Sequence, residues 1–300
     1  NDVRISECIV NKETYYTLLS LEKGVTMYKA LSVILVGALL AFSGCTQEKK
    51  AESKPVAAKE DKSAKVIVVG ATPVPHSEIL EIAKPLLAKD GYTLEIKVFN
   101  DYVIPNKVTD SGEIDANFFQ HSPYLTEFNK NQGTKLVSIG NIHIEPMGIY
   151  SKKIKALSEL KEGDSVAIPN DPTNGGRALD VLATAGLIKL KDTQLKTKLD
   201  IIENPKNLKV TELEAAQLPR VIEDFTIAVI NTNYALPAGL NPSKDALSIE
   251  SSNSPYANII VVKAGNENSE KSKALLKAVK SEEVKKFITE KYKGAIVPTF

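Results

Sequence analysis

The sequence lacks most of the residues and motifs on which enzymes rely. Its 300 residues include no tryptophan, two cysteines and three histidines, and the histidines are scattered along the chain. No serine lies in a G-x-S-x-G elbow, and neither a P-loop nor a G-x-G-x-x-G fingerprint is present. These absences favour a protein that is not an enzyme and that uses no cofactor.

A surplus of one charge sign is also missing. The chain carries 38 basic and 37 acidic side chains, which gives a formal net charge of +1. Proteins that bind nucleic acids need a basic surface, so we expect no nucleic-acid partner.

The apolar run near the N-terminus is too short to span a membrane. Ala30 to Phe42 is thirteen mostly apolar residues, and Ser43-Gly44-Cys45 follows it. This pattern is typical of a signal peptide rather than a membrane helix. The end of the run resembles a bacterial lipobox, in which the cysteine is acylated, although Phe42 stands where an aliphatic residue is usual. The alternative is a buried apolar helix with an incidental cysteine.

This pattern divides the N-terminal region into three expected parts. Residues 1–26, which begin with Asn, are an upstream extension, residues 27–44 are a lipoprotein signal peptide, and residues 45–64 are a lipidated tether. The tether is almost entirely Lys, Glu, Ala and Ser and cannot bury a core, so it should be disordered. We expect Cys45 to anchor the protein to the cell membrane on its extracytoplasmic side, with no cysteine left for an internal disulfide.

From Lys65 onward the pattern alternates between buried strands and amphipathic helices. Lys65 to Ala71 predicts a buried strand, and the apolar stripe after Ser77 predicts a helix that Pro85 should kink. After an extended segment around residue 142 the pattern restarts, with helices near residues 156–160 and over residues 212–223, the second interrupted at Pro219. The fold class is therefore α/β, with two lobes joined by extended hinge crossings. Lobe 1 should comprise residues 65–141 and 253–300, and lobe 2 residues 142–252.

A strand-to-helix turn runs from Pro169 to Arg177. Thr173 or Asn174 is the expected N-cap, and the first helical amides should be open to an anion. Arg177 should lie in the first turn, where its planar fork suits a carboxylate or a phosphate. An ordinary capped helix with a surface arginine explains these residues equally well.

Two other clusters follow predicted strands, namely residues 117–124 and residues 231–234. Ligands of parallel sheets bind beyond the carboxyl ends of the strands, so these clusters and the Arg177 turn should line one cleft. Alternatively, the aromatic residues of the first cluster fill the hydrophobic core. His121, His143 and Glu145 offer an alternative metal site, but no further protein ligand is evident, and we expect no metal.

Several long motifs together resemble the NlpA/MetQ family of methionine-binding lipoproteins. They are NFFQHSPYL (117–125), IYSKKIKALSELKEG (149–163), VAIPNDPTNGGRAL (166–179), ENPKNLKVTELEAAQLPR (203–220) and AVINTNYA (228–235). The resemblance covers residues 65–300. It implies a two-lobed periplasmic-binding-protein (type II) fold and a role in capturing methionine for the permease and ATPase of an ABC importer, with the binding protein itself a monomer.

The resemblance also implies roles for individual residues. Arg177 would grip the ligand carboxylate with Asn174 beside it, and Asn231 would hold the amino-acid head group. Five residues would surround the ligand side chain: Tyr102, Phe118, Phe119, His121 and Tyr124.

The ligand itself stays open at this point, as L-methionine or a close relative. D-methionine, a methionine-containing dipeptide or another apolar amino acid is an alternative, because one methylene changes binding by only about 1 to 3 kcal/mol. A surface lipoprotein without a transport role is the alternative from another class.

Overall fold

The structure is a computed structural model that describes residues 65–300. The predicted extension, signal peptide, Cys45 and tether lie outside the described residues.

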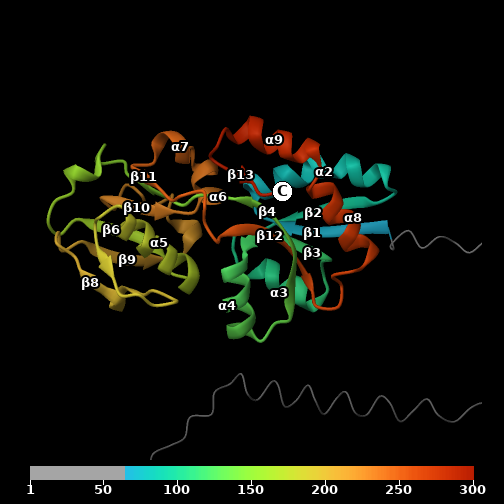
Figure 1. Cartoon of the computed structure of the whole chain (residues 1–300), viewed down its shortest axis with the longest axis horizontal. Coiled ribbons are helices and arrows are strands. Elements are labelled where there is room, and N and C mark those ends of the chain that lie inside the picture. The colour runs from blue at the N-terminus through green and yellow to red at the C-terminus, as the bar shows by residue number, and fades with distance from the viewer. Residues whose placement is uncertain (1–64) are drawn as a thin grey trace, which may run out of the picture. The chain divides into compact units, whose positions relative to one another are not determined.

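The first sheet has six strands in the order β13-β4-β12-β3-β1-β2 (Figure 1). Strand β1 pairs in parallel with β2 and β3, whereas β12 is antiparallel to β3 and β4, and β13 is antiparallel to β4. We call the part of the chain built on this sheet lobe 1. Its strands are β1 (Val66–Ala71), β2 (Thr93–Val98), β3 (Ala116–His121), β4 (Leu136–Ile144), β12 (Ala257–Lys263) and β13 (Val297–Pro298).

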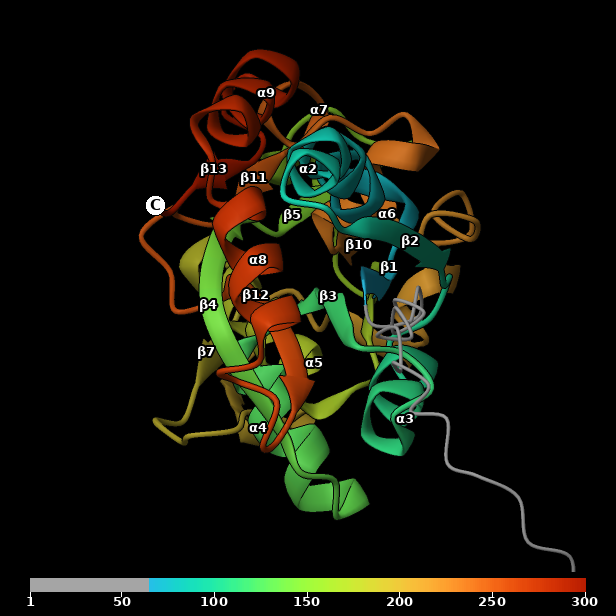
Figure 2. The same cartoon turned by 90° about the vertical axis from the view of Figure 1, so that its right-hand side faces the viewer.

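Helices cover both faces of this first sheet. Helices α2, α8 and α9 lie on one face of the sheet, where they share a hydrophobic core with β1, whereas α3 and α4 lie on the opposite face (Figures 1 and 2). The helices are α2 (Glu78–Lys89), α3 (Ile104–Ser111), α4 (Ser122–Gln132), α8 (Glu270–Val279) and α9 (Glu282–Tyr292), with a helical turn η2 (Pro73–Ser77) before α2.

The second sheet, which defines lobe 2, has five strands in the order β11-β5-β10-β6-β9. Strand β6 is parallel to β9 and β10, and β5 is antiparallel to β10 and β11. The strands are β5 (Gly148–Tyr150), β6 (Ser165–Pro169), β9 (Lys209–Leu213), β10 (Ile227–Ile230) and β11 (Ser248–Ile249), with a small separate pair β7 (Lys189–Leu190) and β8 (Ile201–Glu203). The helices are α5 (Pro172–Thr184), α6 (Thr232–Ala235) and α7 (Pro242–Asp245), with 3-10 turns η3 (Leu157–Glu159), η4 (Lys198–Asp200), η5 (Ala215–Gln217) and η6 (Leu236–Ala238).

The chain passes between the two sheets twice, from β4 to β5 and from β11 to β12 (Figure 1). The lobe boundaries expected at residues 142 and 252 stay a prediction. Between residues 65 and 300, no helix combines the length and the apolarity that crossing a membrane requires.

Two expectations about helices are wrong. In the predicted helix over residues 212–223, Glu212 and Leu213 instead end β9, which pairs in parallel with β6, and only the short turn η5 follows. Residues 156–160 form only the turn η3. Helix α2 continues through Pro85, which is exposed, so that water can solvate the carbonyl that proline leaves without a donor, and the kink expected there stays a prediction.

Candidate functional site

A small pocket lies between the lobes. Lobe 1 contributes aromatic and polar side chains from the ends of β3 and β12, and lobe 2 contributes polar side chains from α5 and from the end of β10. The lining residues are Tyr102, Phe119, Gln120, His121, Tyr124, Glu145, Asn174, Arg177, Asn231, Thr232, Asn233 and Asn258.

The end of β3 supplies one wall of this pocket. Successive side chains of a strand point to opposite faces, so Phe118 and Phe119 must separate. Phe119 lines the pocket, whereas Phe118 is fully buried in the core of lobe 1 against the rings of His76 and His143. The structure therefore places Phe118 away from the pocket, and the aromatic cluster divides between ligand site and core.

His121 ends β3 and caps α4. Its Nδ1 accepts a hydrogen bond from the backbone N–H of Tyr124 at 3.2 Å, so Nε2 carries the proton and donates to Asn174 Oδ1 at 3.1 Å. Burial, reinforced by the positive charge of Arg177, lowers the pKa of His121 to about 3. His121 is thus a neutral ring that joins lobe 1 to lobe 2.

Asn174 connects that ring to the rest of lobe 2. Its side-chain N–H groups donate to both carboxylate oxygens of Asp171 at 3.0 Å, and its Oδ1 also accepts a hydrogen bond from Asn231 Nδ2 at 2.8 Å. Asp171, rather than Thr173 or Asn174, is the N-cap of α5, and it accepts from the backbone N–H of Asn174. The expected open amides at this turn are therefore already partly occupied by the protein itself.

Arg177 lies in the second turn of α5 rather than the first, and only 3% of it is exposed. Its Nε donates to Glu250 at 3.0 Å, its Nη2 donates to the backbone carbonyl of Glu145 at 2.7 Å, and its guanidinium lies 4.2 Å from the ring centroid of Tyr256. This burial excludes the interpretation as a surface arginine. Among the described residues no hydrogen bond involves Nη1, so that donor has no protein partner.

Aromatic side chains close another side of the pocket and also bridge the lobes. The hydroxyl of Tyr102 donates to Asn233 Oδ1 at 2.6 Å, and the hydroxyl of Tyr124 donates to the backbone carbonyl of Tyr102 at 2.9 Å. The rings of Tyr102 and Phe119 are stacked with centroids 5.8 Å apart. Burial raises the pKa of Tyr102 well above its usual value, so the phenol stays a neutral donor.

Two buried polar atoms of the pocket have no hydrogen-bond partner among residues 65–300. They are Asn231 Oδ1, an acceptor, and Asn233 Nδ2, a donor. Buried polar groups are almost always paired, so an unpaired acceptor and an unpaired donor on two residues that line one pocket indicate a ligand with both a donor and an acceptor.

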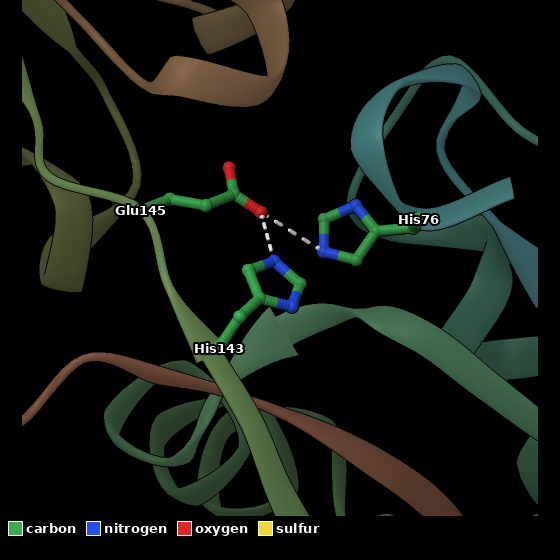
Figure 3. Close-up of side chains that lie close together, drawn as sticks. All are labelled: His76, His143 and Glu145. Atoms are coloured by element: carbon green, nitrogen blue, oxygen red, sulfur yellow. Dashed lines mark hydrogen bonds and ion pairs between the residues drawn. The ribbon is translucent and has the colours of Figure 1, made fainter. Parts of the chain in front are cut away.

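Glu145 lies on the crossing between β4 and β5, beside two buried histidines (Figure 3). Its Oε1 is 2.7 Å from His143 Nε2 and 3.1 Å from His76 Nε2. Burial opposes ionisation of Glu145, but His76 and the hydrogen bonds from both rings outweigh it and hold the pKa of Glu145 below its usual range. Burial lowers the pKa of His143.

These three side chains form the arrangement that the sequence suggested for a metal, with one change. The structure brings His76 to Glu145 and His143 within 4.8 Å, whereas His121 lies on the other side of the pocket against Asn174. His143 Nε2 is hydrogen-bonded to Glu145, and His76 Nε2 lies 3.1 Å from Glu145 Oε1 and 3.0 Å from Asn258 Oδ1, so polar contacts of the protein itself hold the cluster together.

Seven of the eight side chains predicted to bind the ligand line the pocket, and Phe118 does not. Sequence reasoning missed five lining residues. Asn233 and Thr232 stand inside the cluster of residues 231–234, and the sequence suggests Glu145 only as a metal ligand. Gln120 stands inside the cluster of residues 117–124, whereas Asn258 has no signal of its own, because a single amide on a buried strand has no distinctive pattern.

Comparison with known proteins identifies relatives along most of the chain. A family model described as NlpA lipoprotein matches residues 67–300. The D-methionine-binding lipoprotein MetQ of Escherichia coli strain K12 is 45% identical over 280 residues, which cover 90% of this chain and 98% of that protein.

Solved structures give the same result. A nutrient binding protein from Burkholderia cenocepacia bound to methionine is 50% identical with a TM-score of 0.76, and the match covers 78% of this chain and 100% of that one. A lipoprotein from Treponema pallidum is 40% identical with a TM-score of 0.76, covering 78% of this chain and 99% of that one.

These matches confirm the resemblance and the two-lobed α/β periplasmic-binding-protein fold that the sequence predicts. The family model spans nearly all of the described residues and both lobes. The chain belongs to the NlpA lipoprotein family.

Proposed function

We propose that this chain is a lipid-anchored substrate-binding protein that captures methionine between its lobes and delivers it to an ABC importer. The observation that carries the proposal is a pocket between the lobes in which polar atoms without partners face an aromatic wall. The donors are Arg177 Nη1 and Asn233 Nδ2, and the acceptor is Asn231 Oδ1.

These groups suit the two ends of an amino-acid zwitterion. A charged group taken out of water is costly unless an opposite charge and hydrogen bonds meet it. Arg177 supplies a charge-assisted donor for the carboxylate, and Asn231 supplies an acceptor for the ammonium group.

The aromatic wall suits a thioether. Sulfur packs against aromatic rings with about 0.3 to 1.5 kcal/mol per contact, and Tyr102, Phe119 and Tyr124 present their rings to one pocket. The names of the relatives support the same ligand, since one is a D-methionine-binding lipoprotein and another was solved with methionine bound.

Anchoring and transport complete the proposal. Acylation of Cys45 would hold the binding protein at the membrane, facing the extracytoplasmic side, where it would meet the permease and ATPase complex as a monomer. The family's description as lipoproteins and the MetQ name of the relatives support this role.

Calorimetry on the protein lacking residues 1–45, stripped of bound ligand, tests the proposal. We expect heat with L-methionine, and parallel titrations with D-methionine, leucine and methionine dipeptides show which relatives the pocket accepts. Arg177→Ala should weaken binding by about 100-fold or more, because it removes a buried charge-assisted contact. Arg220→Ala, at the other arginine of the described chain, should leave affinity unchanged.

Absence of heat with methionine and with the other amino acids would contradict the proposal. Native mass spectrometry of the protein as purified then identifies what it carries. If no small molecule is retained, a surface lipoprotein without a transport role becomes the better explanation.

A further inference from the structure

The carboxylate of Glu145 is held from one side and open on the other. Both histidine Nε2 atoms approach Oε1, at 2.7 Å from His143 and 3.1 Å from His76. Among residues 65–300 no hydrogen bond reaches Oε2, which points away from both rings in Figure 3. Glu145 is 5% exposed and lines the pocket, so its second oxygen is available to a ligand there.

The two histidines are themselves fixed. His76 Nδ1 lies 2.7 Å from Thr72 Oγ1, and both histidine rings contact the ring of Phe118 at centroid distances of 4.6 and 5.3 Å. Both histidines are fully buried. Two rigid, buried rings therefore set the direction of the Glu145 carboxylate.

The lowered pKa of Glu145 depends on His76 and His143, and among the described residues that line the pocket no other side chain brings a full positive charge to its carboxylate. The guanidinium of Arg177 pairs with the carboxylate of Glu250 and reaches only the backbone carbonyl of Glu145. The pKa of Glu145 lies below its usual range, so the carboxylate is ionised at neutral pH, and the pKa of His121 of about 3 keeps that ring neutral. A buried carboxylate of this kind is stabilised strongly by a cation that joins it.

We propose that Glu145 is the counter-ion of the α-ammonium group of the bound amino acid and that His76 and His143 are positioning residues that aim it. This inference rests on the proposed function and adds the group that reads the amino end. Arg177 on one side and Glu145 on the other then require a ligand with both charges, so the site selects free amino acids against deaminated or N-acylated analogues.

The test compares methionine with 4-(methylthio)butanoate, which has the same side chain and carboxylate but no amino group. In the wild type, methionine should bind more tightly by about 100-fold, the scale of a buried charge pair. Glu145→Gln keeps the shape of the side chain and removes the charge. This substitution should lower the affinity for methionine by about 10-fold or more and change the affinity for the analogue by less than about 3-fold.

Glu95→Gln is the matched control, because Glu95 is exposed on β2 and far from the pocket residues in the sheet order. Equal effects of Glu145→Gln on both ligands, or none on methionine, would overturn the inference. Failure of the wild type to bind methionine refutes the proposed ligand instead. The same pair of measurements is then made with the amino acid that does bind, and binding of no amino acid at all overturns both proposals.

The positioning role has its own measurement. His143→Leu removes the N–H that holds Oε1 and should lower the preference for methionine over the analogue by about 5-fold or more, whereas His143→Gln keeps an N–H and should restore part of it. A purely structural role would reduce both affinities together and leave the ratio unchanged. Titration with Zn²⁺ alone tests the other use of this cluster: tight binding that His143→Gln abolishes would overturn the inference in favour of a metal site.

Discussion

Acidification should open the pocket, because His121 can join the lobes only as a neutral ring. Its Nδ1 accepts from the backbone N–H of Tyr124, so a proton on Nδ1 would break the cap of α4. The charged and titratable groups around the ring are Arg177 and Glu145, together with the phenols of Tyr124 and Tyr256. Arg177 adds repulsion to any protonated form.

The magnitude follows from proton linkage. In the closed arrangement the pKa of His121 is about 3. A histidine that opening exposes to water returns to an ordinary value of about 6.5. Below pH 6.5 the open form therefore binds more protons than the closed form. The contribution of His121 to the stability of the closed form is fully present above pH 6.5 and is lost as the pH falls towards 3. Between pH 7.5 and 5.0 the dissociation constant for methionine should rise by roughly 30-fold.

Calorimetry at pH 7.5, 6.5, 5.5 and 5.0 measures how the dissociation constant for methionine varies with pH, with His121→Gln as the comparison. Glutamine keeps a donor for Asn174 but does not titrate, so this variant should bind more weakly at pH 7.5 and vary much less with pH. If His121→Gln shows the same slope as the wild type, another group carries the pH dependence and the assignment to His121 is wrong.

Three further predictions follow from the fold and the sequence. Phe118→Ala should lower the free energy of unfolding by about 3 to 5 kcal/mol in denaturant titrations, whereas Phe119→Ala should lower methionine affinity more than stability; the reverse pattern would show that the core and pocket faces of β3 are exchanged. Gly175→Ala should lower the melting temperature, because the alanine Cβ would lie 2.9 Å from the carbonyl oxygen of Pro169. Alanine usually stabilises a helix by about 1 kcal/mol over glycine, so a raised melting temperature would contradict this clash. Cys45→Ser should move the protein from the membrane fraction to the soluble fraction and abolish palmitate labelling, and retention of this variant at the membrane would refute the lipid anchor.

The sequence predicts features that depend on neighbouring residues better than those that depend on distant ones. Apolar runs and strand ends identify β1 and β10 and place Phe119, His121 and Asn231 beside one cleft, although residues 117–121 belong to β3 itself rather than following a strand. The strand period separates Phe118 from Phe119, but the sequence alone does not say which face is the core. The stretch over residues 212–223 looks helical by spacing, but its first two residues pair with β6 and only the short turn η5 follows.

Contacts between distant residues explain the rest. Glu250 is 73 residues from Arg177 and has no local signal, yet it neutralises the guanidinium and leaves Nη1 for a ligand. Asn258 and His76 are 182 residues apart and meet only because β12 lies in the first sheet. A pattern of neighbouring residues does not contain such pairs. The sequence therefore predicts the residues that line the pocket better than the residues that hold those side chains in place.

The contacts that close the lobes also explain why closure should require a ligand. Tyr102 with Asn233 and His121 with Asn174 bridge the lobes, but the closed arrangement leaves Asn231 Oδ1 and Asn233 Nδ2 buried without protein partners. Each unsatisfied buried group costs about 1 to 3 kcal/mol, so the two together oppose closure by about 2 to 6 kcal/mol. A shift from 1:99 to 99:1 in favour of the closed form takes about 5.5 kcal/mol. A ligand that satisfies both atoms and pairs with Arg177 therefore supplies stabilisation on the scale that closure needs.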